Sequence, residues 1–141
     1  MQKSKQSDLE RTSKCFTLIK LLLLNNISRA VFSYRVVVVL QMKIYVYNFA
    51  DLTLVDCLDT CNNPNGLCAL NPDSSQNTPA VLALPHTEKG YVKVRSFQNV
   101  KLEIIFACHQ GSIAAMALNR TGDLLTTASE KGTIVRLWRV N

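Results

Sequence analysis

The segment from Thr126 to Trp138 constrains the fold of this chain more than any other part of it. Leu124–Ser129 and residues 133–138 are rich in β-branched and other strand-forming residues, and Glu130-Lys131-Gly132 between them forms a short polar turn. This pattern predicts a β-hairpin whose second strand ends in Trp138. A lone hairpin is marginally stable in water, so the fold must supply further strands.

A repeat of this hairpin supplies those strands. Three related segments, 43–49, 90–95 and 132–138, recur roughly every 40 to 50 residues, which is the period of propeller blades. The sequence therefore predicts an all-β chain, a fragment of a WD-type β-propeller that holds about two to three blades.

The predicted blades divide the chain as follows. Residues 1–33 show no blade pattern and are predicted to be a non-propeller N-terminal leader, while residues 34–141 form the partial propeller. Residues 34–60 are a partial blade with strands at 34–40, 43–49 and 52–58. Residues 66–108 are a complete blade with strands at 66–70, 81–84, 91–97 and 102–107. Residues 113–138 are three strands of a further blade, at 113–118, 124–129 and 133–138.

Two strands have opposite burial patterns. Val36-Val-Val-Val39 leaves no position for a solvated face, which predicts a strand covered on both sides by stacked sheets. In the segment 91–97, Lys93 and Arg95 alternate with valines, as in a half-exposed strand.

The distribution of charge along the chain does not support a nucleic-acid module. The formal net charge is +6, but five of the cations crowd the first twenty residues: Lys3, Lys5, Arg11, Lys14 and Lys20. No aromatic platform is interleaved with basic residues elsewhere, so nucleic acid is not a predicted partner. The basic start does suit a weak, non-specific attraction to anionic surfaces.

The apolar run 16–24 follows this basic start. It is too short to span a bilayer as a helix, and Lys20 interrupts it. A secretory signal is the less favoured alternative, because no clear small-residue cleavage site follows. A short helical or irregular leader is expected.

Five cysteines, an odd and irregularly spaced set, predict free thiols in a reducing compartment rather than a disulfide framework. A metal site built from Cys57, Cys61, Cys68 and His86 is a disfavoured alternative, because the spacing matches no tetrahedral template. No metal, cofactor or catalytic residue is predicted. His86 and His109 fall in separate blades without a nucleophile and an orienting group, so the chain is predicted not to be an enzyme.

Four ordered segments between residues 36 and 138 resemble the PROPPIN family, the phosphoinositide-binding β-propellers related to autophagy-related protein eighteen. They are residues 36–52, Asn63-Pro-Asn-Gly-Leu-Cys-Ala69, His109-Gln-Gly-Ser-Ile-Ala114 and Ala128-Ser-Glu-Lys-Gly-Thr-Ile-Val-Arg136. The resemblance implies a seven-bladed propeller in the intact family. It also implies recruitment to membranes that carry phosphatidylinositol 3-phosphate or the 3,5-bisphosphate during autophagosome formation.

The resemblance assigns a partial lipid head-group site to His109, Ser129, Thr133 and Arg136, with His109 and Ser129 ranked first. In the family a Phe/Leu-Arg-Arg-Gly motif follows this segment and its arginines face two head-group pockets. The sequence reaches Asn141 without the motif, so the chain is expected to be a truncated form whose lipid binding is weak or lost. Lys89-Gly90 and Lys131-Gly132 occupy equivalent turns, and neither is predicted to be a phosphate-binding loop by itself.

A structural role competes with the ligand role for these residues. WD-type blades often join a His before the first strand to a Ser in the second and a Trp in the third, and His109, Ser129 and Trp138 occur in that order. For Arg136, a simple exposed strand cation is the favoured interpretation over a ligand contact.

Two functions follow from the sequence. The first is a non-enzymatic peripheral membrane adaptor of autophagy, cytoplasmic and recruited to preautophagosomal, endosomal or vacuolar membranes, with phosphoinositide membranes and autophagy proteins as partners. The alternative is a WD-repeat scaffold for protein–protein interaction that does not bind lipid.

Overall fold

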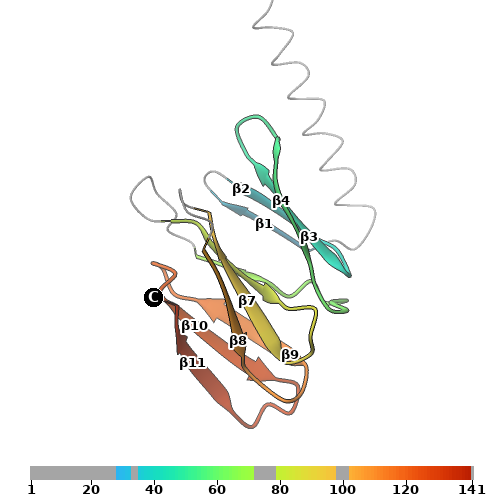
Figure 1. Cartoon of the computed structure of the whole chain (residues 1–141), viewed down its shortest axis with the longest axis vertical. Coiled ribbons are helices and arrows are strands. Elements are labelled where there is room, and N and C mark those ends of the chain that lie inside the picture. Colours follow the sequence, from blue (N-terminus) through green and yellow to red (C-terminus); the bar gives the residue numbers. More distant parts are fainter. Residues whose placement is uncertain (1–27, 33–34, 72–78, 98–101, 141) are drawn as a thin grey trace, which may run out of the picture.

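The computed structural model describes residues 28–32, 35–71, 79–97 and 102–140, which form three antiparallel sheets. Figure 1 shows the sheets following one another along the long axis of the molecule. The first sheet contains β1 (Ser28–Phe32), β2 (Arg35–Val39), β3 (Lys43–Asn48) and β4 (Leu54–Asp59). The second contains β5 (Ala69–Leu70), β6 (Val81–Pro85), β7 (Tyr91–Ser96) and β8 (Leu102–Ala107). The third contains β9 (Ile113–Leu118), β10 (Leu124–Ser129) and β11 (Val135–Arg139).

The second sheet is packed on both faces, and β6 carries most of that packing. All five residues of β6 are buried. Leu82 and Leu84 belong to a core shared with Val37, Val39 and Ile44 of the first sheet. Val81 and Ala83 belong instead to the core around Leu125 of β10. Because successive side chains of a strand point to opposite faces, one strand fills two inter-sheet cores.

The predicted burial of Val36–Val39 is confirmed, since all four valines are buried, but the described residues place a stacked sheet on only one side of β2. Val37 and Val39 face the second sheet, whereas Val36 and Val38 form a separate cluster with partly buried Tyr45 and Tyr47. The residues of this second cluster all belong to the first sheet and its turns, so among the described sheets only the second one packs against β2.

The first sheet extends further toward the N-terminus than the sequence predicted. β1 lies within the segment 1–33 that was predicted to be a non-blade leader, and it pairs with β2 from Ser28↔Val39 to Phe32↔Arg35. The first blade therefore has four strands instead of three, and it begins before residue 34. Ser28, Arg29 and Ala30 precede the strand-forming pair Val31-Phe32, so this segment lacks the continuous β-branched run that marks β2. The rest of the predicted leader, residues 1–27, lies outside the described residues.

Three strands begin later than predicted: β5 begins at Ala69 instead of residue 66, and β4 and β11 begin later because of the turns that precede them. β4 begins at Leu54 instead of residue 52, because the Asp51 carboxylate accepts hydrogen bonds from Thr53 N (3.1 Å) and Thr53 Oγ1 (2.8 Å). Leu52 adopts a left-handed conformation in that turn, with φ of 56°. β11 begins at Val135 instead of residue 133, so the β10–β11 turn is longer than predicted.

The predicted alternation of β7 is confirmed, but its charged side chains are not solvated. Lys93 and Arg95 have side chains only 15% and 14% exposed, and both are paired with Glu103 of β8. Arg95 also contacts Asp56 of β4 at 2.8 Å, so one guanidinium joins the second sheet to the first. An arginine that pairs with carboxylates of two sheets helps to fix the position of one sheet relative to the other.

The third sheet is covered on only one face by the described sheets. Leu125 and Thr127 of β10 point toward the second sheet and are almost fully buried. On the other face, Val135 and Leu137 of β11 are 72% and 65% exposed.

Gly90 makes the closest approach between the second sheet and the chain that leads into the third. Its carbonyl accepts hydrogen bonds from the backbone N–H groups of Cys108 and His109, both at 3.0 Å. Its φ is +84°, and a Cβ built there would lie 1.9 Å from the His109 carbonyl oxygen. Only glycine satisfies both conditions without displacement of the backbone.

Replacement of Gly90 by Ala is therefore expected to lower stability markedly. The added methyl group meets backbone instead of a movable side chain, so the cost should exceed the roughly 1 kcal/mol of an ordinary left-handed Gly→Ala change. Urea denaturation of the full chain, followed by circular dichroism, measures the difference.

Two other glycines serve as matched controls. Gly132 has a φ of +65° but open space where an added methyl group would lie, so Gly132→Ala should show the conformational cost alone. Gly111 has neither obstacle, and Gly111→Ala should be close to neutral. Equal denaturation midpoints for all three variants would contradict the close approach at Gly90.

Candidate functional site

His109 and Trp138 meet at a buried threonine in the third sheet. Thr127 is 1% exposed, and its hydroxyl lies 3.0 Å from His109 Nε2 and 3.1 Å from Trp138 Nε1, which donates to it. The Trp138 ring also packs against Phe106 of β8, with ring centroids 5.4 Å apart. These contacts join the third sheet and the chain that enters it to the edge of the second sheet.

The structural network that the sequence offered as the alternative had Ser129 at this position, whereas the structure places Thr127 there. Trp138 pairs with Leu125 across the β10–β11 ladder, so Thr127 is its diagonal neighbour, whereas Ser129 lies four residues along the strand. At about 3.3 Å per residue, that places Ser129 beyond the reach of the indole. A register shift between Ala128 and Ser129 separates the serine further from the regular ladder.

The four predicted head-group residues do line one concave surface. We call this surface the hairpin hollow: an open cavity of about 930 Å³ between the β10–β11 turn and the chain that joins the second sheet to the third. His109, Ser129, Thr133 and Arg136 all line it, together with Lys89, Glu130 and Lys131. The volume is within the range of about 300–1,000 Å³ that small-molecule sites occupy.

The four residues differ in what they can offer a ligand. His109 has one ring nitrogen at the Thr127 hydroxyl, and Arg136 Nη1 donates to the Cys108 carbonyl at 2.5 Å. Ser129 is half-buried and its carbonyl accepts from Gly132 N, while its hydroxyl has no hydrogen bond to a described residue. Thr133 is exposed in the turn. The hydroxyls are thus more available to a ligand than the histidine that the sequence ranked first.

Positive charge dominates the hairpin hollow. Lys89, Lys131 and Arg136 line it, against the single carboxylate of Glu130 among its described residues. None of the three basic residues forms an ion pair with a described residue. Cations without carboxylate partners and free hydroxyls around one concavity suit an anionic ligand.

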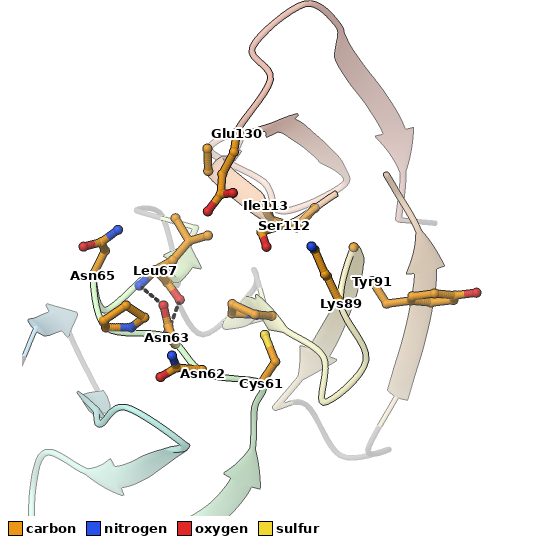
Figure 2. A pocket seen from close by; sticks show the side chains of 14 residues that line it. Cys61, Asn62, Asn63, Asn65, Leu67, Lys89, Tyr91, Ser112, Ile113 and Glu130 are labelled. Carbon is orange, nitrogen blue, oxygen red and sulfur yellow. Dashed lines mark hydrogen bonds between the residues drawn. The ribbon is translucent and has the colours of Figure 1, made fainter. Parts of the chain in front are cut away.

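A smaller cavity adjoins the hairpin hollow. This seam pocket of about 370 Å³ shares Lys89, Tyr91, Ser112 and Glu130 with the hollow and continues to residues 61–67 of the chain between β4 and β5. Figure 2 shows the Lys89 and Glu130 side chains directed into the same space from opposite sides.

The wall of the seam pocket nearest the first sheet is built by turn chemistry. The Asn63 side chain accepts from Leu67 N at 2.8 Å and donates to Leu67 O at 3.0 Å, as the dashed lines in Figure 2 indicate. Gly66 takes a φ of 63° within that loop. The segment from Asn63 to Leu67 is therefore a turn held by its own side-chain hydrogen bonds.

The cysteines of the described residues are free thiols. Burial raises the pKa of the Cys68 thiol to about 11. Burial also raises the pKa of Cys108, partly offset by its hydrogen bond with Thr127. Within the described ranges, no three His, Cys, Asp or Glu side chains converge in a way that could hold a metal ion. The described part of the chain likewise contains no helix long and apolar enough to cross a membrane.

Comparison with known proteins adds to this geometry. The profile of the PROPPIN family matches residues 3–141. The chain belongs to the PROPPIN family. The match extends into the segment 1–33 that the sequence set apart as a leader.

Curated relatives share the family name and a substantial fraction of residues. The chain is 42% identical over 104 residues to autophagy-related protein 18e of Arabidopsis thaliana, with 74% of the chain and 27% of the relative covered. It is 34% identical over 125 residues to autophagy-related protein 18 of Mycosarcoma maydis, with 75% and 27% covered. It is 37% identical over 108 residues to WD repeat domain phosphoinositide-interacting protein 1 of Xenopus laevis, with 75% and 24% covered. The chain therefore spans about a quarter of the length of these relatives.

Solved structures confirm the propeller fold. Kluyveromyces lactis Hsv2 superposes with a TM-score of 0.61 at 19% identity, over 79% of this chain and 34% of that one. KlAtg21, solved in complex with the coiled coil of AgAtg16, superposes with a TM-score of 0.63 at 22% identity, over 80% and 37%. The predictions of a PROPPIN relationship and of an all-β propeller fragment are both confirmed.

Replacement of Thr127 by Val should destabilise this PROPPIN chain. The valine leaves the Trp138 N–H and the His109 ring without their buried partner, and an unsatisfied buried group costs about 1–3 kcal/mol. Thr126→Val is the matched control, because Thr126 lies on the other face of β10 and is only half-buried. Chemical denaturation and the near-ultraviolet signal of Trp138 report the effect. Equal loss in both variants would indicate a general cost of valine in β10.

Cys68 should react slowly with iodoacetamide. A thiol with a pKa of about 11 is about 0.1% thiolate near pH 8, and only the thiolate attacks. Since the pKa is raised, the rate should climb about tenfold per pH unit until the pH approaches 11. Exposed Cys57 is the internal control, and peptide mass mapping separates the two. Equal labelling of both near pH 8 would show that Cys68 is not buried.

Proposed function

We propose that this chain contributes an anion-binding half-site to a non-enzymatic membrane adaptor of autophagy, and that the site recognises the phosphorylated head group of a phosphoinositide. The observation that carries the proposal is the hairpin hollow, where Ser129, Thr133 and Arg136 from one hairpin line a cavity together with two lysines. The family membership supports the choice of ligand, because one relative is named a phosphoinositide-interacting protein.

The chemistry proposed for the hollow is electrostatic recognition without bond making or breaking. The Ser129 and Thr133 hydroxyls donate hydrogen bonds to phosphate oxygens, and the basic side chains neutralise the phosphate charge. Arg136 keeps further guanidinium N–H groups for a ligand while Nη1 donates to the Cys108 carbonyl. His109 contributes to the shape of the hollow more than to its charge, because Thr127 occupies one ring nitrogen.

The cellular role follows from the family. We propose a cytoplasmic protein that is recruited to preautophagosomal, endosomal or vacuolar membranes and that also binds autophagy proteins. The structural neighbour KlAtg21 was solved with a coiled coil of AgAtg16, which supports a protein partner of this kind. Weak binding is expected of these residues alone, because the described lining of the hollow contains a single arginine, Arg136.

A second function is favoured by a different observation. His109 and Arg136 both hold the fold together, through Thr127 and the Cys108 carbonyl, so the same residues make sense in a WD-repeat scaffold that binds only proteins. Lipid binding by the hollow separates the two functions.

Liposome flotation tests the first function. Full-length chain should float with phosphatidylcholine vesicles that contain phosphatidylinositol 3-phosphate more than with vesicles of equal surface charge made with phosphatidylserine. Lys131→Gln should lower this preference because it removes a cation from the hollow, and Glu130→Gln should raise it because it removes the carboxylate. Binding should weaken as salt is added.

A control variant separates the hollow from the basic N-terminal segment. Replacing Lys3, Lys5, Arg11, Lys14 and Lys20 by Gln should reduce flotation with all anionic vesicles while the preference for the phosphoinositide persists. Equal flotation with both vesicle types, unchanged by the Glu130 and Lys131 variants, would rule out head-group recognition and leave the protein-binding scaffold.

A further inference from the structure

Lys89 reaches the hairpin hollow from a different sheet than the other basic residues. It belongs to the turn between β6 and β7, in the second sheet, whereas Lys131 and Arg136 belong to the β10–β11 hairpin of the third. Sequence reasoning assigned this lysine no role, because its turn shows no phosphate-binding pattern and lies about forty residues before the hairpin.

The turn that carries Lys89 is held rigidly against the hollow. Glu88 N donates to His86 Nδ1 at 3.1 Å, Tyr91 N donates to the Glu88 carbonyl at 3.3 Å, and His86 N donates to the Tyr91 carbonyl at 3.0 Å. The next residue, Gly90, is bonded through its carbonyl to the backbone of Cys108 and His109. The backbone of Lys89 is thus fixed relative to the residues that line the hollow, and only its side chain is free to adjust.

The Lys89 ammonium group is also available. It lines both the hairpin hollow and the seam pocket, and it forms no ion pair with a described residue, Glu130 included. Figure 2 shows its side chain extending toward Ser112 at the boundary of the two cavities. By contrast, His109 and Arg136 each commit a side-chain nitrogen to a contact within the protein.

Cations on two walls of one cavity favour a ligand with anionic groups on two sides. The hollow is large enough for a whole phosphorylated ring instead of a single phosphate. A single phosphate on the β10–β11 side would contact Lys131, Arg136 and the hydroxyls and would lie across the cavity from Lys89, which forms no ion pair with Glu130.

We infer that Lys89 is a specificity-determining residue, which binds a second phosphate and so favours head groups with two ring phosphates besides the lipid linkage over those with one. The inference rests on the proposed function, since it concerns the same hollow. Lys89 would thus distinguish head groups with one ring phosphate from those with two. It lies in the second sheet, outside the β10–β11 hairpin that carries most of the predicted site.

Soluble head groups test this inference apart from membrane attraction. Isothermal titration calorimetry of the full chain should give tighter binding of inositol 1,3,5-trisphosphate than of inositol 1,3-bisphosphate. Lys89→Gln should lower affinity for the trisphosphate about tenfold, the value of one charge-assisted hydrogen bond, and change the bisphosphate affinity less than about twofold. Lys89→Arg should retain the preference because it retains the charge.

Lys43→Gln is the matched control. It removes the same charge from an exposed lysine of the first sheet that pairs with Asp59 and lies outside the hollow. It should leave both affinities unchanged. Vesicles containing the 3-phosphate or the 3,5-bisphosphate lipid then show whether the preference holds for the membrane-bound head group.

The outcomes separate the two proposals. If the wild-type chain binds head groups and Lys89→Gln weakens both equally, or neither, the role of Lys89 is overturned while the proposed function stands. If the wild-type chain binds neither soluble head group nor phosphoinositide vesicles, the proposed function falls and this inference falls with it. Loss of the trisphosphate preference in Lys89→Gln alone, with circular dichroism unchanged, supports it.

Discussion

The architecture depends on one strand that is covered on both faces. β6 sends Leu82 and Leu84 into the core with the first sheet and Val81 and Ala83 into the core with the third. Burial of apolar surface stabilises a fold by roughly 25 cal/mol per Å². Because β6 buries side chains on both faces, it adds this stabilisation to two interfaces. A polar residue at any of these positions would face a dry core without a partner, whichever side it pointed to. The order of the sheets therefore follows from the burial of β6.

The position of the candidate site follows from this stacking. Once β6 and β7 lie against the third sheet, the β6–β7 turn comes next to the chain that enters β9, and the absence of a side chain at Gly90 permits direct backbone hydrogen bonds. The Thr127 hydroxyl then joins His109, which lies in the chain that enters β9, to Trp138 of β11. The hairpin hollow thus lies between two clamped segments, and its shape is set before any ligand arrives.

Much of this arrangement was predictable from the sequence, because the signals were periodic. The valines of β2, the alternation in β7 and the hairpin ending at Trp138 all identify strands by residue type and spacing. Features without a regular pattern were missed: β1 begins with Ser, Arg and Ala instead of strand-forming residues, and the Asp51 turn delays the start of β4. The sequence could not show that Thr127, and not Ser129, contacts Trp138. That contact depends on which residue of β10 pairs with Trp138 across the ladder. The place of Lys89 in the hollow was missed for a related reason, since it is set by packing between sheets.

Structural and binding roles are divided among the residues of the hollow according to where they lie in the ladder. His109 and Arg136 sit beside groups that the fold must satisfy, the Thr127 hydroxyl and the Cys108 carbonyl, so substitutions there disturb stability together with binding. Lys89, Glu130 and Lys131 lie in turns, exposed and without ion pairs to described residues. The charge of the hollow can therefore change through these turn residues while the network beneath it stays intact. If the hollow binds anions as proposed, its choice of anion can vary without any change in the strands that hold the blades together.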